Sequence, residues 1–168
     1  MAEGEGMSTE THLSTSIKWL IPKNNSWIKR ISLIFAFILL DYLVTLLLCK
    51  SPVYEANPLA RSFMEAYGSP LGLSLFVLAA NIPIYLILTV DSHLVSLVPR
   101  LSKAVEVSAD FAFAWFIAGV HFDGASSWLW YAPDALRQTI GALIYLFISF
   151  FLVTKLIKIR SGRLCIDI

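Results

Sequence analysis

Long apolar runs separated by short polar segments dominate the pattern of this chain. Three runs are clear and lie at about residues 31–49, 71–90 and 136–157. Each has about 20 residues, which is the length an α-helix needs to cross the hydrocarbon core of a bilayer. Ser69 and Pro70 open the second run with a capping hydroxyl and a proline at the first helical position. The pattern therefore predicts membrane-spanning helices.

A fourth run, within residues 104–131, allows two registers. A span at 104–122 buries Glu106, whereas a span at 110–131 leaves it in water. We favour 110–131, because three aromatic residues then form an interfacial belt at its end. These residues are Trp128, Trp130 and Tyr131. This register places His121 at mid-depth.

Between the first two spans, the residues Asn57 to Gly68 have the signals of a short helix. Asn57 is a good N-cap, Pro58 suits the first helical position, and Gly68 suits the stop. Apolar residues recur on one side of this segment, as is typical of a helix lying at the membrane surface. We therefore expect an all-α bundle of four transmembrane helices with a short outer interfacial helix.

Composition and charge agree with a membrane protein. The chain has 168 residues, of which 57% are hydrophobic and 15% charged, and its mean hydropathy is +0.71. A soluble domain of this size cannot bury so much apolar surface, so the expected partner is the lipid bilayer, with other membrane subunits or further copies of the chain as candidates. A net charge of +1 argues against nucleic-acid binding. Cys49 and Cys165 are too far apart for a CxxC metal site.

The chain divides into three segments, and its flanking charges predict how the spans are oriented in the membrane. Residues 1–16 are small and polar and are expected to be a disordered tail, residues 17–160 form the transmembrane domain, and residues 161–168 form a short cytoplasmic tail. The flanks of the spans carry ten Lys and Arg residues on one side of the membrane and three on the other. Cytoplasmic flanks generally contain more of these residues than outer flanks do. We expect a multi-pass protein of the cell membrane with both termini in the cytoplasm. The ten are Lys18, Lys23, Lys29, Arg30, Arg100, Lys103, Lys155, Lys158, Arg160 and Arg163; the three are Lys50, Arg61 and Arg137.

Polar residues inside the spans are the candidates for function. Asp41 is the eleventh residue of its span, roughly 15 Å deep at about 1.5 Å per residue, where an isolated carboxylate costs about 2.5–3.5 kcal/mol on insertion scales. Asn81 holds the same place in the second span, and His121 reaches a similar depth. The structural alternatives are that Asp41 joins helices through hydrogen bonds, helped by Thr45, and that Asn81 binds the carbonyl freed by Pro83.

Two functional classes remain open. The first is an intramembrane site for metal-assisted hydrolysis of a lipid or peptide. Its candidate catalytic residues are Asp41, His121 and Asp123; its candidate substrate-binding residues are Glu55, Asn57 and Asn81. Carboxylate and imidazole suit zinc or a similar divalent ion, with Asp41, Glu55, His121 and Asp123 as candidate ligands. The second class is a non-catalytic subunit of a larger membrane complex, in which these polar groups hold helices together.

Two short motifs also carry a resemblance. Asp41-x-x-x-Thr45, followed by Glu55-Ala56-Asn57-Pro58-Leu59, resembles an uncharacterised family of small archaeal and bacterial integral membrane proteins. These have about four spans, an acidic residue in the first, and an E-x-N-P turn. The family more often has D-x-x-T, so Thr45 is one place off, and the later HFDGASSW segment is a looser match. The resemblance implies a membrane bundle with a polar site and implies no reaction.

Overall fold

The computed structural model describes residues 18–23, 25–94 and 107–163. All regular secondary structure in these ranges is helical, which confirms the all-α prediction. The predicted tail at 1–16, the end of the tail at 164–168, and the loop cations Arg100 and Lys103 lie outside the described residues.

Three helices are long and apolar enough to cross a bilayer. They are α2 (Asn25–Leu48), α4 (Ser69–Leu94) and α7 (Asp134–Arg163). Their apolar stretches run over Trp27–Leu48, Ser69–His93 and Asp134–Phe151. The helix α4 begins at Ser69, one residue before the start at Pro70 that the capping signal predicts. Length and composition thus support a membrane location.

The remaining predicted span is a composite helix. Residues 107–113 are α-helical, Ala114–Gly119 form a π-helical turn (η2), and Val120–Ser127 form α6. The helix ends at Ser127, before the predicted end of the span at residue 131. The amides of Leu129 and Trp130 bond to the Ser126 carbonyl and close the last turn, so the three aromatic residues of the expected belt lie in or at the turn before α7.

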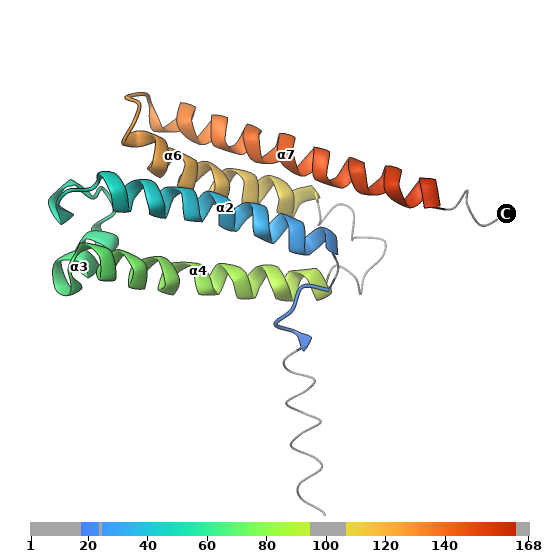
Figure 1. Ribbon diagram of the computed structural model, residues 1–168, viewed down its shortest axis with the longest axis horizontal. Helices are drawn as coiled ribbons and strands as arrows, with labels where there is room; N and C mark the ends of the chain where they lie inside the picture. Colours follow the sequence, from blue (N-terminus) through green and yellow to red (C-terminus); the bar gives the residue numbers. More distant parts are fainter. Residues whose placement is uncertain (1–17, 24, 95–106, 164–168) are drawn as a thin grey trace, which may run out of the picture.

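The helices lie side by side in the order α7, α6, α2, α4 (Figure 1). The helix α2 is central: it contacts α4 on one flank and α6 with η2 on the other. The core forms around Tyr145 and Ile34, whose side chains are fully buried. Large apolar side chains such as Phe116 and Phe147 point outward, as expected of a surface that faces lipid.

The short helix α3 (Pro58–Tyr67) packs against the start of α4 at one end of the bundle (Figure 1). The Asn57 side chain accepts hydrogen bonds from two amides of its first turn, and Gly68 ends it with φ +82°, a value that glycine adopts without strain. The predicted cap, proline and stop are therefore confirmed. Ala60 and Met64 face the bundle and are buried, which fixes this helix over the adjacent cavity.

Candidate functional site

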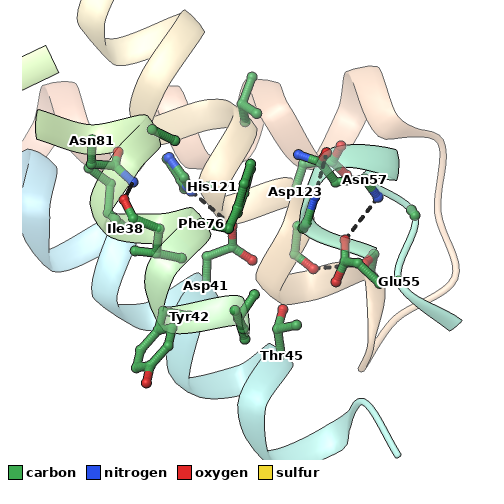
Figure 2. A pocket seen from close by; sticks show the side chains of 18 of the residues that line it. Ile38, Asp41, Tyr42, Thr45, Glu55, Asn57, Phe76, Asn81, His121 and Asp123 are labelled. Atoms are coloured by element: carbon green, nitrogen blue, oxygen red, sulfur yellow. Dashed lines mark hydrogen bonds and ion pairs between the residues drawn. The ribbon is translucent and has the colours of Figure 1, made fainter. Parts of the chain in front are cut away.

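A cavity of about 550 Å³ lies between α2, α4 and α6, next to the turn that precedes α3 (Figure 2). The turn forms one end of the cavity. The structure brings all six residues that the sequence analysis selected to its wall: Asp41, Glu55, Asn57, Asn81, His121 and Asp123. These residues come from three helices and a turn, and Asp41 and His121 alone are 80 positions apart in the chain.

Asp41 and His121 form a direct pair across the interface of α2 and α6. The Asp41 Oδ2 atom lies 2.8 Å from His121 Nδ1, and the two side chains are 24% and 22% exposed. The carboxylate accepts the hydrogen on Nδ1, which leaves Nε2 of a neutral ring as an acceptor. The ring therefore has one nitrogen held by Asp41 and the other available for chemistry.

The pair lies nearer to the α3 end of the bundle than counting residues predicts. Asp41 lies seven residues before the end of α2 at Leu48, which is roughly 10 Å at about 1.5 Å per residue. The helix α2 starts at Asn25, six residues before the predicted start of the span, so its middle lies before Asp41. His121 lies at a similar level, because α6 ends six residues later at Ser127.

Gly124 allows this pair to form. A Cβ atom at this position would lie 2.6 Å from Asp41 Oδ1 and 2.9 Å from Oδ2, well inside van der Waals contact. Only glycine lets the α6 backbone approach the carboxylate so closely. The loosely matching HFDGASSW segment thus supplies both the imidazole and the space beside it.

Asn81 is almost completely buried, with 5% of its surface exposed. Its amide nitrogen donates to the Val77 carbonyl at 2.8 Å, so the expectation that it serves the Ala79 carbonyl freed by Pro83 is wrong. Side chains in a helix lean toward its N-terminus, and a short one reaches the carbonyl four residues back. The Asn81 Oδ1 atom is buried and has no hydrogen-bond partner among the described residues.

Asp123 has a different role from Asp41. Its Oδ1 pairs with Arg137 Nε at 2.5 Å and its Oδ2 accepts from Gln138 at 3.3 Å. The same guanidinium binds Asp134 and the carbonyls of Trp130 and Ala132. Arg137 therefore stabilises the turn between α6 and α7. Both carboxylate oxygens of Asp123 already have hydrogen-bond partners. In the sequence, Arg137 is recognisable only as a charge that flanks a span.

The turn at Glu55 is built by local hydrogen bonds. Glu55 Oε1 accepts from the Asn57 amide at 2.9 Å, and Arg61 Nε donates to the Glu55 carbonyl at 3.0 Å. Together with the Asn57 cap, these bonds hold the E-x-N-P turn in one conformation beside the cavity. Glu55 and Asn57 thus shape its end, and the Glu55 carboxylate retains an oxygen with no hydrogen bond among the described residues.

Aromatic side chains that sequence analysis had not assigned to the site complete its wall. Trp128 Nε1 donates to Thr45 Oγ1 at 3.2 Å, so Thr45 supports this indole rather than Asp41. The Tyr42 hydroxyl and Ser74 Oγ lie 2.9 Å apart and link α2 to α4. Phe76 and Tyr54 also line the cavity. No periodicity of a single helix reveals these contacts, because each joins two elements.

The arrangement suits proton exchange better than metal binding. Among the described residues, no group of three His, Cys, Asp or Glu side chains converges to surround a metal ion, so the expectation of zinc gains no support. An imidazole held at Nδ1 by a carboxylate takes up or releases a proton at Nε2.

Comparison of the chain with protein-family models, with curated proteins and with solved structures gave no match, so the suggested family resemblance stays a prediction.

Proposed function

We propose that this protein is a multi-pass protein of the cell membrane that binds the polar end of a membrane-soluble molecule and exchanges a proton with it. The cavity between α2, α4 and α6 is the binding site, and the Asp41–His121 pair is the proton-exchanging group. The single observation that carries the proposal is the 2.8 Å contact of these two side chains in the wall of a cavity of about 550 Å³.

The proposed topology has four spans and both termini in the cytoplasm. Residues 107–127, with their π-helical turn, form 21 helical residues, and at about 1.5 Å per residue they reach roughly 30 Å. This segment lies beside α2 and α7 and would be the third crossing. The excess of Lys and Arg in one set of flanks supports the orientation, and it puts the Glu55 turn on the outer side.

Hydrolysis of a lipid or peptide is less well supported than binding with proton exchange. The His121 Nε2 atom would serve as the base for water, but a hydrolytic transition state also develops negative charge that needs nearby donors or cations. The described cavity wall contains carboxylates and no Lys or Arg. Such an environment disfavours a developing oxyanion.

A non-catalytic subunit would use the same polar groups only to hold helices together. The Asp41–His121 contact does tie α2 to α6. Groups that serve only packing are expected to fill the space between helices, as protein interiors generally do. Here the six candidate polar residues line an open volume of ligand size, which favours a binding site.

The proposal is tested by purification in mild detergent, followed by mass spectrometry of bound small molecules and of co-purifying chains. We expect a small molecule bound to the wild-type protein and its amount reduced at least tenfold in Asp41→Asn and His121→Ala. Glu65→Gln is the matched control, because Glu65 is exposed on α3 and lies outside the described cavity wall. Equal retention in all variants, or partner chains with no small molecule, would contradict the proposal.

A further inference from the structure

The free polar atoms in the cavity wall are predominantly hydrogen-bond acceptors, and the wall is acidic. Three carboxylates line it, those of Asp41, Glu55 and Asp123, and the described wall contains no Lys or Arg. Arg137, which lies behind the wall, neutralises Asp123. Asp41 and Glu55 remain, and the Arg61 guanidinium, which donates to the Glu55 carbonyl, offsets part of their charge, so the wall stays negative while His121 is neutral. A cation is the complementary ligand.

Asn81 supplies independent support for a hydrogen-bond donor on that ligand. The residue lines the cavity and is 5% exposed. Its Oδ1 atom is buried and has no hydrogen-bond partner in the part of the chain that the structure describes, although its amide nitrogen is satisfied by Val77. A buried acceptor left without a donor is costly. The Nε2 atom of His121 is a second acceptor when the ring is neutral, because Nδ1 faces Asp41.

The size and the aromatic content of the cavity favour an organic cation over a bare metal ion. A volume of about 550 Å³ falls within the range of small-molecule sites, which is about 300–1,000 Å³. Tyr54, Phe76 and Trp128 contribute aromatic rings to the wall, and such rings attract ammonium groups through their π faces. The described residues also offer no cluster of three metal-ligating side chains.

We propose that the ligand bears a protonated primary or secondary amine on an apolar chain; this inference rests on the proposed function and names its substrate class. The amine places its charge near Asp41 and Glu55 and gives N–H donors to Asn81 Oδ1 and His121 Nε2. A quaternary ammonium has the charge and no N–H group, so it leaves these acceptors unsatisfied. The site therefore distinguishes an amine from its trimethylated form.

The test uses three probes with one apolar chain: dodecylamine, dodecyltrimethylammonium and 1-dodecanol. Binding to the full chain in lipid nanodiscs is measured by native mass spectrometry and by the shift in unfolding temperature. We expect dodecylamine to bind at least tenfold more tightly than either of the other probes. Equal binding of the two cations would overturn the role of the N–H donors. Equal binding of all three would show partition into the apolar phase only and would overturn the whole inference.

Variants locate the binding. Asp41→Asn keeps the shape of the side chain and removes its charge, and we expect it to weaken dodecylamine binding at least tenfold. Asn81→Leu should reduce the preference for dodecylamine over its trimethylated analogue, because it removes an acceptor that only the amine uses. Glu65→Gln, the control, should bind as the wild type does. Wild-type affinity in both cavity variants would overturn the assignment of the site.

The two proposals fail in different ways. If the chain retains a co-purifying small molecule that depends on Asp41 but shows no preference for amines, the substrate class is wrong and the proposed function stands. If neither a co-purifying molecule nor an added probe depends on Asp41 or His121, both are wrong.

Discussion

The apolar helix α2 tolerates the Asp41 carboxylate because this group contacts His121, on another helix, at 2.8 Å. A similar depth for both residues is predictable from the sequence, since the rise of a helix is fixed and the residues of each span can be counted. Their contact is not predictable in this way. That depends on α2 and α6 being neighbours, and on Gly124 leaving room for the carboxylate.

Gly124→Ala tests this close approach. The added methyl group would fall 2.6 Å from Asp41 Oδ1, so the carboxylate or the helix must move and the pair with His121 should break. Overpacking of this kind costs about 1–3 kcal/mol. We expect a loss of this size in the unfolding free energy in mixed micelles, together with loss of ligand binding. Wild-type values for both would show that the approach is less close than described.

Arg137→Leu tests the other ion pair at the site. The Arg137 side chain is 8% exposed and Asp123 is 16% exposed, so the change leaves a mostly buried carboxylate without its cation. Removing one partner of such a pair typically costs about 3–5 kcal/mol. The double variant Arg137→Leu/Asp123→Leu should recover part of that loss, as measured by unfolding in a double-mutant cycle. Additive losses would show that the two groups do not interact.

At the scale of elements, the helix boundaries that local signals mark were predictable, and the irregular π-helical turn was not. The Asn57 cap, Pro58 and Gly68 predict α3, and Ser69 with Pro70 predicts the start of α4, because each signal acts within one turn of helix. The π-helical turn at Ala114–Gly119 has no comparable signal. It packs against α7, which lies later in the chain.

The helix α4 provides a prediction at this scale. Because the Asn81 amide donates to Val77 O and not to the carbonyl freed by Pro83, the effects of Asn81→Leu and Pro83→Ala on stability should be additive within about 0.5 kcal/mol. The measurement is a double-mutant cycle on the unfolding free energy. A larger coupling would mean that the Asn81 side chain does serve the proline-induced gap.

At the scale of the whole molecule, three of the apolar runs were predictable as long helices, and the order of the helices in space was not. Hydropathy alone marks α2, α4 and α7, whereas the central position of α2 (Figure 1) follows from which helix faces fit together. That position decides the site, because α2 presents Asp41 to a cavity shared with α4 and α6.

Topology is tested by cysteine labelling in intact cells. Cys49 is buried, with 8% of its surface exposed, so this residue should react slowly; Cys165→Ser removes the other thiol. In that background we expect Tyr131→Cys to react with an impermeant maleimide from outside, and Gly162→Cys to react only after the cells are opened. Labelling of position 162 from outside would contradict the cytoplasmic location of the C-terminus.

The most direct test of the central claim is the protonation of His121 observed by nitrogen-15 NMR. The protein would be labelled at histidine and placed in lipid nanodiscs, with His121→Gln used to assign the signal. The Asp41–His121 pair predicts a hydrogen-bonded proton on Nδ1, and Asp41→Leu should change that signal. An Nδ1 without a proton in the wild-type protein, or a His121 spectrum that Asp41→Leu leaves unchanged, would contradict the account.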